Sequence, residues 1–130
     1  MAVAKNPYSN YTNHIVSTAS KEKITLMLYD GALKFVNQAM IALETKNYEK
    51  VNEAVFRALD IIRELQTTLD RKYEISDNLF ACYEYIHERL VSANAAKDAD
   101  IFAETRDYLR QFRDTWKEAM ERAQKLAQSG

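Results

Sequence analysis

The 130-residue sequence has little of what a β-rich or loop-rich protein needs, with two glycines and one proline. Turns depend on these residues, so their scarcity disfavours both classes. The single cysteine, Cys82, has no partner for an internal disulfide. No apolar run approaches the roughly 20 residues of a membrane span, and the N-terminal stretch lacks the pattern of a secretory signal. We therefore expect a cytosolic, all-α domain.

Charge of one sign is also lacking, and so are the side-chain sets of common active sites. Eighteen basic and nineteen acidic residues leave a net charge of -1, which disfavours nucleic acid as the main partner. Glu84 and His87 have the spacing of a di-iron ligand pair, but such a site needs a second pair and two further glutamates. The other histidine, His14, has no glutamate three residues before it. We expect no enzyme, no metal and no cofactor.

What the sequence does contain is long stretches of apolar residues at helical spacing, separated by short breaks. This pattern predicts an antiparallel up-down four-helix bundle. The helices are expected over residues 20–45, 48–69, 76–94 and about 97–126. Ser76 or Asp77 is expected to cap the third helix. The bundle domain would span residues 20–130, and residues 1–19 would form an irregular arm that docks through apolar anchors such as Tyr8 and Tyr11.

The apolar residues of the first helix cover a wider arc than a simple bundle requires. One stripe follows Ile24, Leu28, Phe35, Ala39 and Ala42, and a second follows Leu26, Leu33, Val36, Met40 and Leu43. A bundle helix needs an apolar stripe a little over 100° wide. The surplus either contacts a second neighbouring helix or lines an exposed groove for a partner helix. Gly31 costs about 1 kcal/mol in mid-helix, which predicts close approach of another helix or of a ligand backbone.

Several motifs lie along nearly the whole chain. They are Asn6-Pro7-Tyr8-x-x-Tyr11, Thr18-Ala19-Ser20, the block from Leu26 to Phe35, Leu65-x-x-x-Leu69-Asp70 and the segment from Arg113 to Ala119. Together they resemble the bacterial flagellin-specific export chaperones, the FliS family. The Leu28-Tyr29-Asp30-Gly31-Ala32 block is the most specific part. Lys21 departs from the family pattern, which often has proline there, and this departure concerns only the start of the helix.

The resemblance implies a non-enzymatic chaperone of the bacterial cytosol that binds the disordered C-terminal segment of flagellin. The client would lie as helices in apolar grooves, which prevents premature polymerisation and aids delivery to the flagellar export apparatus. The arm would cover part of this surface when no client is bound, and weak self-association is compatible with the family. The candidate client-binding residues are Tyr8, Tyr11, Leu26, Tyr29, Gly31, Leu33, Val36, Tyr83 and Trp116. Two alternatives are a signalling bundle phosphorylated on His87 and a structural homo-oligomer whose surplus apolar face pairs with itself.

Overall fold

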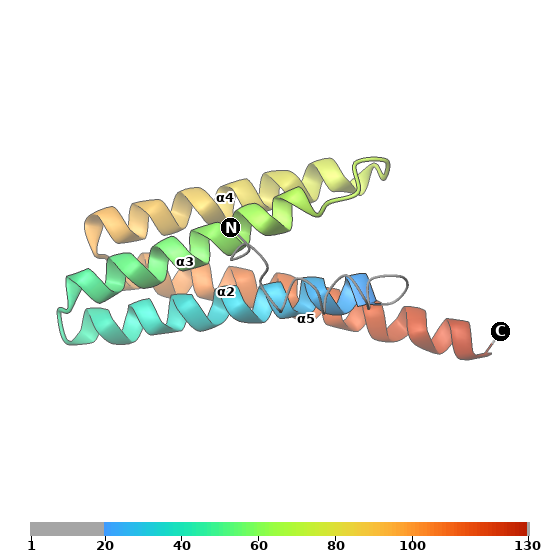
Figure 1. The fold of residues 1–130 in the computed structure, drawn as a ribbon, viewed down its shortest axis with the longest axis horizontal. Coiled ribbons are helices and arrows are strands. Elements are labelled where there is room, and N and C mark those ends of the chain that lie inside the picture. The colour runs from blue at the N-terminus through green and yellow to red at the C-terminus, as the bar shows by residue number, and fades with distance from the viewer. Residues whose placement is uncertain (1–19, 130) are drawn as a thin grey trace, which may run out of the picture.

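The computed structural model describes residues 20–129, which form four antiparallel α-helices (Figure 1). They are α2 (Ser20–Glu44), α3 (Tyr48–Thr67), α4 (Ile75–Ala96) and α5 (Ala99–Ser129). Each helix packs against the next in the chain, and α5 returns to pack against α2. The predicted four-helix bundle is thereby confirmed, while the expected arm lies outside the described residues. Within residues 20–129, no helix is both long and apolar enough to cross a membrane.

Two tight connections turn the chain between antiparallel helices. After α2, Lys46 takes a left-handed backbone conformation with φ 56°, and the Asn47 side chain accepts a hydrogen bond from the Lys50 amide at 3.3 Å. After α4, Lys97 takes φ 50°, and the Asp98 carboxylate accepts hydrogen bonds from the first amides of α5. Both connections combine a left-handed stop with an N-cap, which confirms the break predicted at residues 46–47.

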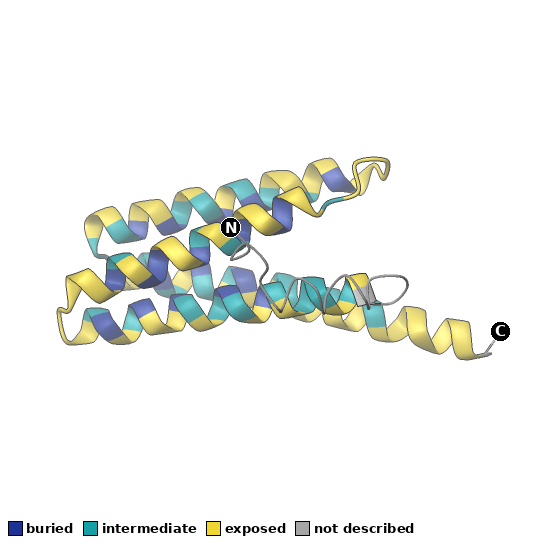
Figure 2. Cartoon of the chain, viewed as in Figure 1, coloured by how far each residue is buried: buried dark blue, intermediate teal, exposed yellow. Residues whose placement is uncertain are grey.

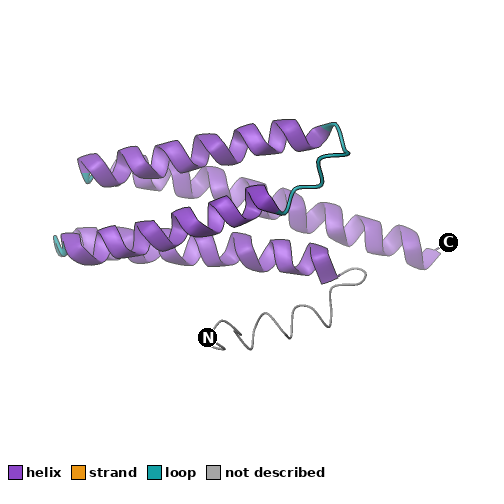
Figure 3. Ribbon diagram, turned by 45° about the horizontal axis from the view of Figure 1, so that its top comes forward, coloured by secondary structure: helices purple, strands orange, loops and turns teal. Residues whose placement is uncertain are grey.

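The connection between α3 and α4 is the longest of the three loops in Figure 3 and differs from the prediction. The helix begins at Ile75, so the expectation that Ser76 or Asp77 caps it is wrong. Glu74 already has helical φ and ψ and forms no side-chain cap. Backbone hydrogen bonds from the Ser76 and Asp77 amides to carbonyls three residues earlier start the helix instead. Turn hydrogen bonds thus do the work of a capping side chain here.

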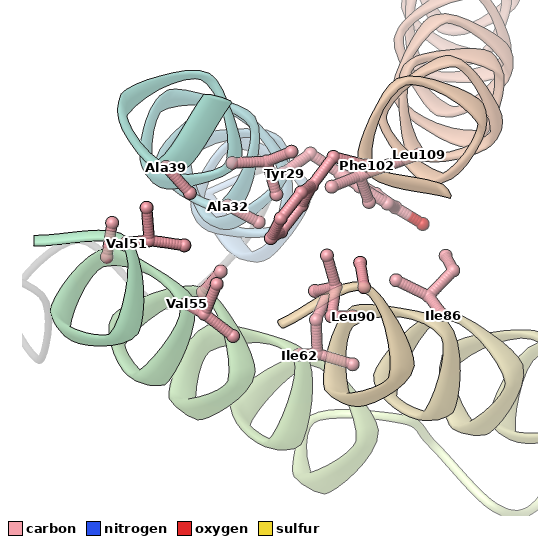
Figure 4. Close-up of a cluster of buried hydrophobic side chains, with 14 of the residues drawn as sticks. Tyr29, Ala32, Ala39, Val51, Val55, Ile62, Ile86, Leu90, Phe102 and Leu109 are labelled. Carbon is pink, nitrogen blue, oxygen red and sulfur yellow. The ribbon is translucent and has the colours of Figure 1, made fainter. Parts of the chain in front are cut away.

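The interior is filled by one apolar face from each helix, shown as the dark blue side of each ribbon in Figure 2. Figure 4 shows the same cluster in close-up, with small residues of α2 opposite valines of α3. The largest fully buried side chains are Tyr29, Phe102, Ile62, Leu65, Ile86, Leu90, Leu109, Val36, Val51 and Val55. Burying a side chain of this size stabilises the fold by about 1.5–3 kcal/mol. The core therefore holds all four helices together.

A polar contact crosses this apolar core between α2 and α4. The hydroxyls of Tyr29 and Tyr83 form a short hydrogen bond, and their rings lie 6.1 Å apart. The two side chains are 1% and 2% exposed. Burial raises the pKa of both phenols, so both stay protonated and one hydroxyl donates to the other. The pair satisfies hydroxyls that would otherwise be buried without partners.

Candidate functional site: the groove between α2 and α5

The seam between α2 and α5 carries a half-buried apolar surface, which we call the α2–α5 groove. It contains two successive hollows. The first, of about 150 Å³, is lined by Glu22, Trp116, Ala119, Met120 and Ala123. The second, of about 350 Å³, is lined by Asp30, Leu33, Asn37, Arg110, Arg113 and Asp114. The groove therefore changes from apolar to polar as it runs from the start of α2 toward the middle of the bundle.

The apolar hollow is built around Trp116. Its indole Nε1 donates a hydrogen bond to the backbone carbonyl of Glu22 at 3.0 Å, which fixes the ring against the first turn of α2. Ala119, Met120 and Ala123 follow at helical spacing and continue the apolar face along α5. The carboxylate Oε2 of Glu22 is buried and has no hydrogen-bond partner among the described residues. The walls that the hollow presents are thus almost entirely apolar.

An ion pair occupies the middle of the groove. The Arg113 guanidinium Nε lies 2.8 Å from an Asp30 carboxylate oxygen, and a second nitrogen of Arg113 lies 3.0 Å from Asp114. These hydrogen bonds, first the one to Asp30, raise the pKa of Arg113. Both partners are partly open to water, so the pair contributes about 1 kcal/mol or less to stability. Its clearer effect is to fix the register of α5 against α2 beside Leu33.

Two of the candidate residues predicted from the sequence come together in this groove. Leu33 and Trp116 line its two hollows and are half-buried. Leu26 lines neither hollow, but it is half-buried and lies one helical turn from both Glu22 and Asp30. Two segments distant in sequence, residues 22–37 and 110–123, are thus joined into one surface.

Comparison with known proteins places the sequence in a family. The sequence pattern of the family described as flagellar protein FliS matches residues 4–123. The chain belongs to this family. It is 42% identical to the flagellar secretion chaperone FliS of Bacillus subtilis over 93% of this chain and 91% of the relative. It is 32% identical to the flagellar secretion chaperone FliS of Escherichia coli, over 81% and 79% of the two chains. The FliS of Salmonella typhimurium is likewise 32% identical, over 83% and 82%.

Four other candidates lie elsewhere in the described bundle. Tyr29, Val36 and Tyr83 are core residues, at most 2% exposed, and line neither hollow of the groove. Gly31 faces α3, because a Cβ added there would lie 3.2 Å from Cδ1 of Ile61. Of the two expectations for this glycine, close approach of another helix is the one that the geometry supports. Tyr8 and Tyr11 lie outside the described residues.

Several residues of the groove are not among the candidates predicted from the sequence. The charged stretch from Lys117 to Arg122 predicts a solvated face, and Arg122 does pair with Glu118 at 2.7 Å, one turn away. Met120, within the same stretch, is half-buried and lines the apolar hollow. The spacing of Trp116, Ala119, Met120 and Ala123 is the signal that could have found it. The Asp30–Arg113 ion pair joins residues distant in sequence, so no local sequence pattern predicts it.

His87 lies on a different seam, between α3 and α4. Its Nδ1 is 3.4 Å from Nη2 of Arg63. The other terminal nitrogen of that guanidinium, Nη1, donates a hydrogen bond to Glu84 Oε1 at 2.7 Å. Partial burial, followed by the charge of Arg63, lowers the pKa of His87. The imidazole therefore favours its neutral form and accepts from Arg63. This environment makes His87 part of the packing between two helices.

Proposed function

We propose that this protein is a cytoplasmic export chaperone for flagellin. It binds the disordered C-terminal segment of flagellin as helices, prevents premature polymerisation and aids delivery to the flagellar export apparatus. It acts by binding and carries out no chemical step. Membership of the FliS family and relatives named flagellar secretion chaperones support this proposal.

The observation that carries the proposal is the apolar hollow of the α2–α5 groove. Trp116 and Met120 are half-buried there, and α5 continues beyond the start of α2 with residues 121–128 exposed (Figures 1 and 3). An amphipathic client helix can place its apolar face in such a hollow. The hollow thus offers burial to the apolar face of a client helix.

The N-terminal arm is assigned the role of a removable cover. Tyr8 and Tyr11 precede Ser20, the first residue of α2, and the apolar hollow is built on the first turn of that helix. An aromatic body with a polar tip suits a surface that is alternately covered and wet. The arm and the client would compete for the same contacts. Ordering the client costs about 2–5 kcal/mol of the gross interaction, which keeps the complex releasable at the export apparatus.

Calorimetric titration with a peptide covering the last helical segments of flagellin tests the function. We expect stoichiometric binding with a strongly negative heat-capacity change, because apolar surface is buried as the client folds. Absence of binding at high micromolar concentration would contradict the proposal.

Deleting residues 1–17 should increase binding of a dye specific for exposed apolar surface and should change client affinity, while the helical content of residues 20–129 stays constant.

Two matched variants locate the site. Ala123→Asp adds a charge to the apolar hollow at an exposed position, so we expect a folded protein with client binding weakened about tenfold or more. Phe56→Asp is the control, because Phe56 is 60% exposed on α3 and lines neither hollow. Equal client affinity in the two variants would place the client elsewhere. Leu33→Asp tests the polar half of the groove in the same assay.

A further inference from the structure

The outer side of the α2–α3 pair carries a row of charged side chains that the proposed function leaves unused. The row runs along α3 and consists of Lys50, Glu53, Arg57 and Asp60. These residues follow one another at intervals of three, four and three positions, so they share one stripe of the helix. All four are exposed, and their charges alternate in sign. The row extends over about 15 Å of the helix axis.

The four charges of this row have no partner of opposite charge in the described part of the chain. Their spacing predicts pairs within the helix, such as Glu53 with Arg57 one turn later. The ion pairs found within residues 20–129 nevertheless include none of the four residues. Arg57 instead lies over the Phe35 ring, 5.6 Å from its centroid. The row therefore presents charges of both signs to an approaching surface.

An apolar groove lies beside this row, where α2 packs along α3 (Figure 1). Its volume is about 450 Å³, and the first three members of the row line it together with the buried Ala42 and Ala54. Ile41 lines it from α2 and is 64% exposed. A partner that pairs with the charges would thus also cover an exposed aliphatic side chain, which is the anatomy of a protein interface.

The order of the charges makes the row complementary to itself. When two copies of α3 run antiparallel with the midpoints of their rows aligned, Lys50 of one copy faces Asp60 of the other. In the same register, Glu53 faces Arg57. Two-fold symmetry repeats both contacts, so four pairs of opposite charge form. A shift by one helical turn would place Lys50 opposite Arg57, so the charges also define the register.

We propose that this face docks a second copy of the chain, with the two α3 helices antiparallel and joined by the four charge pairs. The same contact covers Ile41 of both copies, which adds burial of apolar surface. The N-terminal residues 1–19 contain no aspartate or glutamate, so they cannot neutralise the two cations of the row. Exposed charge pairs each contribute little, so the dimer is weak and sensitive to salt.

Two variants of the full-length chain, each with charges of a single sign in the row, test this interface. Lys50→Glu combined with Arg57→Glu makes the row entirely acidic, and Glu53→Lys combined with Asp60→Lys makes it entirely basic. Sedimentation velocity at low salt measures the dimerisation. Each variant alone should self-associate about tenfold more weakly than the parent protein, because like charges meet. An equimolar mixture of the two should form a heterodimer, because every pair of charges is then complementary.

A matched control separates this interface from an effect of net charge. Lys117→Glu combined with Arg122→Glu changes the net charge as much as the acidic variant does, at exposed positions of α5. This control should self-associate like the parent protein, and circular dichroism should show equal helical content in all variants. Higher ionic strength should weaken the parent dimer.

Three results would each overturn the proposal. They are a parent protein that stays monomeric at high micromolar concentration in low salt, a mixture of the acidic and basic variants without heterodimer, and equal weakening in the α5 control. The dimer contact uses no residue that lines the two hollows of the α2–α5 groove. Flagellin is absent from these measurements, so their outcome is independent of flagellin binding.

Discussion

Leu33 and Val36 stand one helical turn apart on α2 and carry similar aliphatic side chains, yet they lie in different surroundings. Val36 is 1% exposed among the core residues of all four helices. Leu33 is half-buried beside Asp30 and Asn37 in the α2–α5 groove. The difference arises because α2 has two packed neighbours, α3 and α5, and an apolar arc wide enough to reach beyond both. Apolar residues at helical spacing therefore mark a helix face without revealing what covers it.

The largest expected effect comes from comparing a charge introduced in the core with a charge introduced in the α2–α5 groove. Val36→Asp buries a carboxylate with no partner, so we expect a loss on the order of 4 kcal/mol or more in the free energy of unfolding. Typical domains have about 5–15 kcal/mol in total. Ala123→Asp, at the exposed end of the groove, should stay within about 0.5 kcal/mol of the parent protein. Urea denaturation followed by circular dichroism measures both free energies of unfolding. Similar denaturation midpoints for the two variants would contradict the distinction between core and groove.

The next effect concerns the polar pair inside the core. Tyr83→Phe leaves the Tyr29 hydroxyl buried without a partner, so we expect a loss of about 1–3 kcal/mol in the free energy of unfolding. Replacing both tyrosines by phenylalanine also removes the unpaired Tyr29 hydroxyl, so it should recover much of that loss. Tyr85→Phe is the control, because Tyr85 is 45% exposed. A double variant less stable than the single one would show that the hydrogen bond itself is the main contribution.

The fold could be predicted from the sequence because its signals are local. The left-handed position at Lys46 and the cap at Asn47 stand in a short polar break between two apolar periodic segments. The prediction that Ser76 or Asp77 caps α4 is wrong because backbone hydrogen bonds of the preceding turn start the helix instead. Such turn geometry depends on the whole loop, so no single residue type predicts where the helix begins.

The groove could be predicted only in part. Leu33 and Trp116, which line its hollows, are among the candidates because the motif blocks that carry the family resemblance contain them. The same blocks include Tyr29 and Gly31, which pack against other helices. Membership in a motif thus does not separate core residues from residues that line a surface groove. That separation depends on which helices are neighbours, and this information is tertiary.

A smaller effect is expected from pH, and it sharpens the contrast between the polar α3–α4 seam and the apolar groove. Partial burial and Arg63 lower the pKa of His87 from 6.5, so the unfolded chain binds this proton more readily than the folded one. The free energy of unfolding should therefore fall as the pH drops below 6.5. Hydrogen bonds from Arg63 and Gln66 lower the pKa of Glu84, so a second decline is expected below 4.5.

Denaturation curves at a series of pH values, compared between the parent protein and His87→Gln, measure the first decline. Glutamine at this position keeps an acceptor for Arg63 and does not titrate, so the slope just below pH 6.5 should become smaller while the decline below 4.5 remains. An unchanged slope near 6.5 would assign the titration to another group.

The smallest effect is expected at Gly31, where α2 approaches α3. Replacing glycine by alanine in mid-helix gains up to about 1 kcal/mol, but the new Cβ would lie 3.2 Å from Ile61 Cδ1. That methyl ends a flexible, half-buried side chain and can move by a few tenths of an ångström. Gly31→Ala should therefore change the free energy of unfolding by less than about 1 kcal/mol, toward greater stability. The gain should increase in an Ile61→Val background, which lacks the contacting atom. An unchanged gain there would mean that the cost of this glycine is offset by something other than the approach of α3.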